Sequence, residues 1–236
     1  MARVTAPAAS ESRTHYWDWV SADEQPHHRY LVPVVLRALG PAAGRTLLDI
    51  GCGNGALTAK MAEAGFRAAG VDSEVSGIER ARGGFPGIDF SLQDVSEPLP
   101  AELRDRFDVV VTAEVIEHLF LPRQLFARAR EALAPDGVLV VTTPYHGYVK
   151  NLMIAAFNQF DEHVGALGDY CHIKFFSRKT LGEMARQCGF EPVRWDTAGR
   201  VPPIAASMVM TARLSPSSRP ASPPPDREGS VVSIRP

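Results

Sequence analysis

A glycine-rich loop that follows an apolar run is the feature that most constrains this chain. Residues 47–50 (L-L-D-I) lead into Gly51, Gly53 and Gly55, so glycine stands at every second position, and helix-forming residues follow at 56–64. Because glycine has no Cβ, it adopts dihedral angles that other residues avoid, and its backbone can pass close to a ligand. A strand, a tight turn and a helix in this order predict the start of a doubly wound α/β fold with a ligand at the turn.

Two carboxylates near this loop indicate which ligand it binds. Gly51, Gly53 and Ala56 formally satisfy the dinucleotide pattern G-x-G-x-x-A. Dinucleotide sites bring a pyrophosphate to the helix N-terminus, and Asp49 would repel it. A carboxylate there instead suits a ligand that carries a cation, such as the ammonium and sulfonium of S-adenosylmethionine. Asp72, at the end of the next apolar strand, is placed to accept hydrogen bonds from ribose hydroxyls.

The pattern D-x-G-x-G-x-G beginning at Asp49, together with Asp72, resembles motif I of the class I S-adenosylmethionine-dependent methyltransferases. The resemblance runs over residues 47–214. It implies an α/β fold with a Rossmann-like seven-stranded sheet, in which six strands are parallel, the last strand is antiparallel and helices cover both faces. It also implies that the loop residues and the neighbour of Asp72 line the cofactor, namely Gly51, Cys52, Gly53 and Ser73.

Apolar runs alternate with helical segments along the chain, as a parallel sheet with right-handed crossovers requires. The segment 107–112 (F-D-V-V-V-T) is a continuous apolar run, as expected of a strand buried on both faces. The remaining strands are predicted at 47–50, 88–92, 138–142, 191–196 and 204–213, in addition to the strand that ends at Asp72. Helices are predicted at 31–39, 56–64, 74–82 and 122–133.

Asp94 directly follows the third predicted strand. In methyltransferases that this chain resembles, an acid at this place accepts a hydrogen bond from the adenine amine, and the next residue, here Val95, packs beside it or donates its amide. Aspartate is also common in turns after strands, where it bonds to its own backbone. Because the preceding motif is complete, we expect Asp94 to have the adenine role.

A second polar cluster, A-E-V-I-E-H, lies at the end of the fourth predicted strand. If a helical turn begins there, Glu114, Glu117 and His118 stand at i, i+3 and i+4 and share one face. Two crowded carboxylates favour either a cation between them or a raised pKa. Carboxylate oxygen suits Mg²⁺, whereas imidazole is more typical of Zn or Fe. Alternatively, Glu114 lines the methionine end of the cofactor and His118 acts as a base or packs.

The ubiquinone-biosynthesis type O-methyltransferases carry E-x-x-E-H at this place, and the chain is closest to them in motif pattern. Plant-type small-RNA 2'-O-methyltransferases add a histidine in an H-K-F context. Residues 172–175 (H-I-K-F) match that context with one inserted residue. The resemblance implies a site for Mg²⁺ or another divalent ion, made by Glu114, Glu117, His118 and His172. As an alternative, His172 is a substrate-facing base or caps a strand.

The stretch 145–174 is too long for a simple connection, and long insertions at a functional edge usually form lids or binding walls. Its apolar segment 151–160 predicts a helix, and His146 and His163 are candidates for contact with substrate. The apolar face indicates a hydrophobic or aromatic substrate, or peripheral contact with a membrane surface of the kind that the ubiquinone-type enzymes show. The other interpretation is a helix packed on its own domain.

One methyltransferase domain, 15–214, is predicted between two disordered ends, 1–14 and 215–236. The first end is small and polar, and the second is rich in serine and proline. Tyr16 and Trp17 open the domain. Related enzymes fold an N-terminal helix over the cofactor, so we expect Tyr16 to cover it; alternatively, these aromatic residues anchor a partner.

Composition agrees with a single enzyme domain. The formal net charge of the 236 residues is −2, so no general polyanion-binding surface is predicted and nucleic acid is not an expected partner. Cys52, Cys171 and Cys188 have no disulfide-framework spacing, and no stretch is typical of a signal peptide or a membrane span. We therefore expect a cytoplasmic protein.

The predicted activity is methyl transfer from S-adenosylmethionine to an oxygen of a small, hydrophobic or aromatic hydroxylated metabolite. His118, His146 or His172 acts as the base, or a bound metal ion lowers the pKa of the hydroxyl. One alternative is a non-catalytic cofactor-binding partner subunit, against which the intact glycine loop and both acids argue. A further alternative is an RNA 2'-O-methyltransferase.

Overall fold

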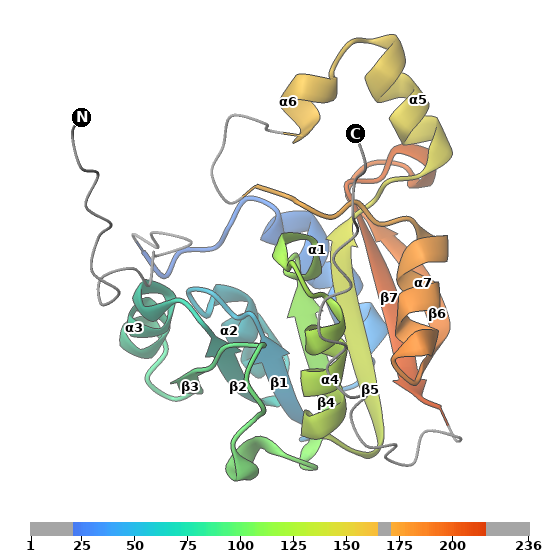
Figure 1. Ribbon diagram of the computed structural model, residues 1–236. Coiled ribbons are helices and arrows are strands. Elements are labelled where there is room, and N and C mark those ends of the chain that lie inside the picture. Colours follow the sequence, from blue (N-terminus) through green and yellow to red (C-terminus); the bar gives the residue numbers. More distant parts are fainter. Residues whose placement is uncertain (1–20, 165–170, 216–236) are drawn as a thin grey trace, which may run out of the picture.

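A computed structural model describes residues 21–164 and 171–215 (Figure 1). Tyr16, Trp17 and the two predicted disordered ends lie outside the described residues, apart from Ser215. Seven α-helices are found in the described ranges: α1 His28–Leu39, α2 Ala56–Glu63, α3 Val75–Gly84, α4 Arg123–Ala132, α5 Tyr148–Ala156, α6 Phe160–Val164 and α7 Arg178–Gln187. Among these helices, none combines the length and apolarity needed to cross a bilayer.

The strands form one sheet in the order β3-β2-β1-β4-β5-β7-β6. Strands β1 to β5 are parallel to one another, and β7 runs antiparallel to both β5 and β6. The prediction of six parallel strands and an antiparallel last strand is therefore confirmed. The strands are β1 Thr46–Ile50, β2 Arg67–Asp72, β3 Asp89–Leu92, β4 Phe107–Ala113, β5 Leu133–Pro144, β6 Phe190–Ala198 and β7 Ser207–Leu214.

The sheet buries side chains on both faces, as the continuous apolar run of β4 predicted. Because successive side chains of a strand point to opposite faces, Val110 packs in one core and Val109 and Val111 pack in the other. The first core also contains Leu125 of α4, together with residues of α7. The second core contains Leu31 of α1, together with residues of α2. Helices thus cover both faces (Figure 1).

The strand order places a binding edge at the centre of the sheet. Strand β1 pairs with β2 on one side and with β4 on the other, so the chain reverses its direction of winding between β1 and β4. In doubly wound folds, ligands bind outside the carboxyl ends of the strands at this reversal. The glycine loop after β1 and the polar cluster after β4 both lie at this edge.

The insertion differs from the single helix predicted at 151–160. It forms α5 and α6, which stand above the binding edge of the sheet (Figure 1). Helix α5 begins at Tyr148 and ends at Ala156, and Asn158 then adopts a positive φ of 52°. Asparagine tolerates this left-handed conformation and commonly ends helices. The apolar pattern was therefore correct about a helix and wrong about its limits.

Candidate active site

The glycine loop joins the end of β1 to α2 through three residues with positive φ angles. Gly51, Gly53 and Gly55 have φ angles of 81°, 52° and 79°, a region that glycine adopts at little cost. The Gly51 amide donates a hydrogen bond to the Val71 carbonyl oxygen at 2.8 Å, which holds the loop against β2. A Cβ on Gly55 would lie 2.7 Å from the Phe90 ring. These positions require glycine for backbone conformation and, at Gly55, also for packing.

The loop forms one end of a cavity of about 900 Å³ at the carboxyl edge of the sheet. Every predicted cofactor residue within the described part of the chain lines this cavity: Asp49, Gly51, Cys52, Gly53, Asp72, Ser73, Asp94, Val95 and Glu114. His118 and His172 line it as well. His146 and Glu117 are not among the lining residues.

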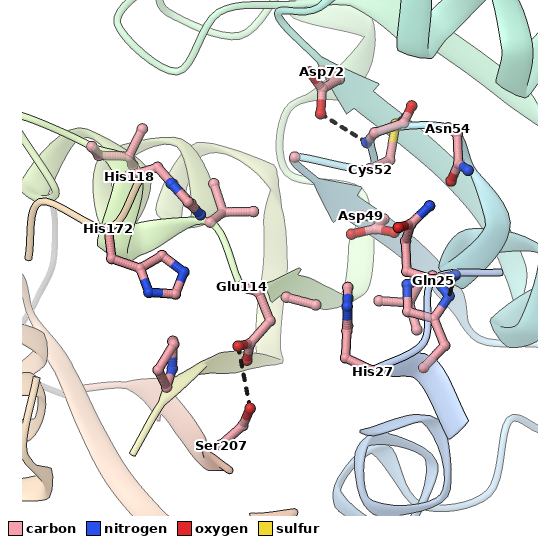
Figure 2. A pocket seen from close by; sticks show the side chains of 18 of the residues that line it. Gln25, His27, Asp49, Cys52, Asn54, Asp72, Glu114, His118, His172 and Ser207 are labelled. Carbon is pink, nitrogen blue, oxygen red and sulfur yellow. Dashed lines mark hydrogen bonds between the residues drawn. The ribbon is translucent and has the colours of Figure 1, made fainter. Parts of the chain in front are cut away.

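Asp49 presents a half-satisfied carboxylate to the cavity (Figure 2). Its Oδ2 accepts a hydrogen bond from Thr58 Oγ1 at 2.7 Å, whereas Oδ1 is buried and has no partner in the described residues. Burial raises the pKa of Asp49 to about 7, the Thr58 hydroxyl acts against this rise, and the nearby Asp72 carboxylate adds to it. A buried carboxylate without a full set of partners is costly, so a cationic ligand group fits beside Oδ1.

The Asp72 carboxylate is held by backbone amides. Oδ2 accepts a hydrogen bond from Gly53 N and Oδ1 from Glu74 N, both at 2.8 Å. Burial raises the pKa of Asp72, while the amide hydrogen bonds from Glu74 and Gly53 act in the opposite direction. Because each oxygen has a second lone pair, the fixed carboxylate can still accept hydrogen bonds from a ligand in the cavity.

Asp94 lies at the mouth of the cavity after β3. Its Oδ1 accepts a hydrogen bond from Ser96 N at 2.8 Å, the local turn bond considered above as an alternative, and the side chain is exposed. Val95 is half-buried and packs against the core. This hydrogen bond engages Oδ1. Oδ2 can therefore still accept a hydrogen bond from a ligand.

The segment before α1 covers the cofactor end of the cavity, and it was not recognised in the sequence. Asn54 Nδ2 donates hydrogen bonds to Ser21 O at 3.0 Å and to the carbonyl oxygen of Asp23 at 2.9 Å, which fasten this segment to the glycine loop. As a result, Gln25 and His27 line the cavity. Figure 2 shows Gln25 beside Asp49. The sequence signal nearest to this segment is the P-H-H-R-Y run at residues 26–30, which leads into α1.

Glu114 stands at the centre of the cavity wall and not on a helical face. It follows β4 with a φ of 55°, and a 3₁₀ helix then forms at Ile116–His118. The Glu114 carboxylate accepts hydrogen bonds from Thr142 Oγ1 at 2.8 Å and from Ser207 Oγ at 3.2 Å (Figure 2). Burial raises its pKa to about 7. The predicted shared face of Glu114, Glu117 and His118 is therefore wrong, because the backbone turns left-handed at Glu114.

The structure instead groups Glu117 with His118 and His172. One ligand atom from each of the three side chains lies within 4.8 Å of the others. The two imidazole centroids are 4.8 Å apart, and His172 Nε2 lies 3.9 Å from Glu117 Oε1. Backbone amides of Ile173 and Lys174 donate to the Glu117 carbonyl oxygen at 2.9 and 3.0 Å, so His172 is anchored beside the 3₁₀ helix despite its distance in sequence.

Electrostatics favour a neutral His172 in this group, and one carboxylate oxygen of Glu117 has no hydrogen-bond partner in the described residues. Glu117 Oε2 accepts a hydrogen bond from Thr143 Oγ1 at 2.9 Å, but Oε1 is buried and has no partner in the described residues. Burial raises the pKa of Glu117, and the charge of Glu114 adds to the effect. Burial lowers the pKa of His172 to about 4, with further contributions from neighbouring cationic groups. A carboxylate and two imidazoles form a donor set that fits a divalent ion.

His146 lies outside the group formed by Glu117, His118 and His172. Its ring contacts His163 at a centroid distance of 5.2 Å and Phe175 at 5.1 Å. Its Nδ1 is 3.3 Å from Asn151 Oδ1, and burial lowers its pKa to about 4. His163, in contrast, lines the cavity. Of the two histidines of the insertion, His163 is thus the one placed to meet a ligand.

Comparison with known proteins agrees with this geometry. The chain matches a methyltransferase domain family over residues 22–194. It is 30% identical to the ubiquinone biosynthesis O-methyltransferase of Cereibacter sphaeroides over 176 residues, which cover 73% of this chain and 70% of the relative. It is 38% identical to the Caulobacter vibrioides protein of that name over 109 residues, which cover 45% of this chain and 43% of the relative.

Solved structures share the fold. The magnesium protoporphyrin IX methyltransferase of Synechocystis with bound SAH has a TM-score of 0.59 at 18% identity and covers 78% of this chain and 82% of its own. The Burkholderia thailandensis 1,6-didemethyltoxoflavin-N1-methyltransferase has a TM-score of 0.57 at 23% identity and covers 78% and 77%. Fold, cavity and sequence together define a class I S-adenosylmethionine-dependent methyltransferase. The chain belongs to the methyltransferase domain family.

Proposed function

We propose that the protein methylates a hydroxyl oxygen of a small, hydrophobic or aromatic metabolite. The observation that carries this proposal is the composition of one continuous cavity. Its glycine-loop end has the buried Asp49 and the half-buried Asp72, and its other end has His118 and His172 beside the buried Glu117. The similarity to ubiquinone biosynthesis O-methyltransferases supports oxygen as the acceptor atom.

At the cofactor end, each acid has a separate role in binding S-adenosylmethionine, which supplies the methyl group. Asp49 faces the cationic amino-acid end with its free Oδ1. Asp72 accepts hydrogen bonds from the ribose hydroxyls, and Asp94 accepts one from the adenine amine. The segment that carries Gln25 and His27 excludes water from this end. Methyl transfer benefits from alignment and desolvation, and orientation alone can supply on the order of 7–11 kcal/mol.

At the acceptor end, His118 and His172 face the acceptor hydroxyl. A general base works best with a pKa near the operating pH, so an imidazole with a pKa of about 4 is a weak base for a phenol. His172 is better suited to bind a cation through its neutral ring nitrogen. A divalent ion held by Glu117, His118 and His172 would lower the pKa of an acceptor hydroxyl.

The donor set also bears on which ion is bound. Glu114 is engaged by Thr142 and Ser207 and lies outside the three-residue group. The remaining set of two imidazoles and one carboxylate is less typical of Mg²⁺ than of Zn²⁺, Fe²⁺ or Mn²⁺. In place of Mg²⁺, we propose a transition-metal ion at Glu117, His118 and His172.

Apolar surface beside the cavity supports a hydrophobic acceptor. On the insertion, Leu152 is 54% exposed, Phe157 68% and Phe160 63%. Exposed apolar patches at a binding site commonly guide hydrophobic ligands or contact membranes. The same surface supports the peripheral membrane contact expected from the resemblance, and co-sedimentation with lipid vesicles that is lost in Phe157→Asp would be the expected result.

The proposal is tested by incubating the protein with methyl-labelled S-adenosylmethionine and metabolite extracts, followed by product identification. Label on the oxygen of a hydroxylated product is the expected result, whereas label on nitrogen or carbon would refute O-methylation. Chelation should lower turnover, and added Mn²⁺ or Zn²⁺ should restore it more fully than Mg²⁺. Glu117→Gln should abolish the response to metal, with the exposed Glu79→Gln of α3 as the matched control. Activity that is indifferent to chelation would remove the metal and leave a histidine base.

A further inference from the structure

A smaller cavity of about 320 Å³ adjoins the main one beneath the insertion. The two cavities share three lining residues, and all three are basic: Lys150 of α5, His163 of α6 and Arg200, which follows β6. The smaller cavity continues past them between apolar side chains of Met153, Ile154 and Ile204. A ligand that extends from the main cavity into the smaller one must therefore pass a ring of basic groups.

Lys150 is the most unusual member of this ring. It is only 7% exposed, although lysine is almost never buried unless it is paired. Its Nζ donates a hydrogen bond to the Ala206 carbonyl oxygen at 3.4 Å, and within residues 21–164 and 171–215 it forms no ion pair. Glu114 attracts the Lys150 ammonium from across the wall without reaching it. Because Lys150 lines both cavities, its ammonium has donor positions left for a ligand.

Arg200 adds a second charge at a strained position. Its φ of 49° follows the positive φ of Gly199, 63°. A non-glycine residue in the left-handed region carries a conformational cost on the order of 1 kcal/mol or more and is usually kept for a reason. In the described part of the chain its guanidinium has no ion pair. Burial lowers the pKa of Lys150, and the charge of Arg200 adds to this effect. Arg200 is exposed to solvent, so the fold places one solvent-facing cation and one buried cation on the wall that the two cavities share.

The acids nearby do not neutralise this pair. Glu114 has a pKa raised to about 7 by burial and is already hydrogen-bonded to two hydroxyls. Glu162 lines the smaller cavity on its exposed side, and it makes no ion pair with either base. Oxygen ligands between Lys150 and Arg200 would satisfy both groups with charge-assisted hydrogen bonds.

The position of the ring assigns it to the acceptor and not to the cofactor. Ala206, to which Lys150 donates, precedes Ser207 at the start of β7. Strands β4 and β5 separate β7 from β1, whose end carries Asp49 and the glycine loop. The two basic residues therefore lie on the far side of Glu114 from the cofactor end.

We propose that Lys150 and Arg200 bind a carboxylate of the methyl acceptor, and that the apolar part of the smaller cavity takes a hydrophobic substituent beyond it. This inference rests on the proposed function, because it narrows the acceptor from a hydroxylated metabolite to a hydroxylated carboxylic acid. His163 completes the ring as a neutral hydrogen-bond donor.

Binding tests this assignment without requiring turnover. Calorimetry on the S-adenosylhomocysteine complex compares two acids, 3,4-dihydroxybenzoate and 3-(3,4-dihydroxyphenyl)propanoate, with their uncharged amides. At least one acid should bind at least about tenfold more tightly than its amide. This difference in affinity corresponds to one hydrogen bond to a charged group. Lys150→Met and Arg200→Gln should each remove most of that preference, and Arg200→Lys should retain it. Lys179→Met, on the exposed side of α7, is the charge-matched control.

The possible outcomes separate this inference from the proposed function. Acids and amides that bind equally would overturn the carboxylate site, even if both are methylated. An acid preference without methyl transfer would uphold the site and refute the proposed function. If Lys150→Met and Arg200→Gln weaken S-adenosylhomocysteine binding, the anion at this ring is the carboxylate of the cofactor, and the proposal is overturned.

Discussion

Replacing Asp49 with asparagine is expected to stabilise the cofactor-free protein at alkaline pH while it weakens cofactor binding. In the free protein, the carboxylate is buried with Oδ1 unpartnered. Asparagine keeps an oxygen that can accept the Thr58 hydrogen bond, which is 2.7 Å long in the native protein, and it carries no charge. The substitution thus removes an unfavourable buried charge from the free protein and an attractive charge from the complex.

The size of the effect follows from the pKa of Asp49, which burial raises from 3.8 to about 7. Between these two values the native state binds more protons than the unfolded state, so the free energy of unfolding falls as pH rises. The stability that the protonated carboxyl contributes is complete below pH 3.8 and is lost above pH 7. At about 1.4 kcal/mol for each pKa unit, the full loss is about 4 kcal/mol, of which about 3 kcal/mol falls between pH 5 and pH 8.

Urea unfolding of both proteins at pH 5 and pH 8 measures this change. The advantage of Asp49→Asn over the wild type should be about 3 kcal/mol larger at pH 8 than at pH 5. Other groups that titrate are common to the two proteins, so their contributions cancel in the difference. The exposed Asp89→Asn of β3 is the control for loss of one carboxylate.

Calorimetry at pH 7 measures the opposing effect on the complex. Asp49→Asn should weaken S-adenosylhomocysteine binding by about 1.5–3 kcal/mol, as expected when a hydrogen bond to a charged group is lost. An advantage that is equal at pH 5 and pH 8 would refute the reasoning about the buried charge. Unchanged cofactor affinity would refute the assignment of Oδ1 to the cationic end of the ligand.

Further predictions concern the other acids and the loop. Asp72→Ala should weaken S-adenosylhomocysteine binding by about 1.5–3 kcal/mol in calorimetry, and tighter binding of NAD by the wild type would contradict a ribose contact of this cofactor. His172→Ala and Glu117→Ala should each lower kcat at least about a hundredfold with little change in cofactor affinity; full activity would make the group structural. Gly55→Ala should lower the free energy of unfolding by about 1–3 kcal/mol, because its Cβ would meet Phe90 at 2.7 Å, and an unchanged urea midpoint would show that the ring gives way.

The cofactor half of the cavity was predictable because its determinants are local in sequence. The glycine loop, Asp49 and Asp72 follow directly from strand ends, and parallel strands bring their carboxyl ends to one edge. Backbone hydrogen bonds then fix the details, such as the Gly53 amide on Asp72. The sequence pattern was sufficient to predict which residues lie together at this edge of the sheet. That pattern consists of alternating strands and helices with an acid at two strand ends.

The polar cluster after β4 was predicted incorrectly in geometry because its backbone depends on a tertiary contact. A spacing of i, i+3 and i+4 assumes a helix, but Glu114 adopts a φ of 55°. Val115 then packs directly over Gly51. A glutamate with a left-handed backbone conformation has no sequence signature. The structure was therefore needed to show that Glu117, and not Glu114, groups with the two histidines.

Residues at the far end of the cavity could not be found from the sequence, since they come from segments that only the fold brings together. Lys150 lies in an otherwise apolar helix, Arg200 follows the sixth strand, and Ser207 begins the seventh. Gln25 and His27 meet the cavity because Asn54 fastens their segment to the loop. None of these side chains belongs to a spaced motif, and their common feature is a shared position beside the cavity.

Taken from end to end, the cavity has a charge order that matches the chemistry. Asp49 and Asp72 line one end, His118 and His172 line the middle beside the buried Glu117, and Lys150 and Arg200 line the far end. If the acceptor is the carboxylic acid proposed above, a cationic donor and an anionic acceptor would be drawn to opposite ends and kept in line, the arrangement that a displacement at carbon needs. Transfer of the methyl group removes the sulfonium charge, so Asp49 attracts the product less than the reactant. With the role proposed for Asp49, the buried carboxylate that makes the free protein less stable would contribute both to cofactor selection and to product release.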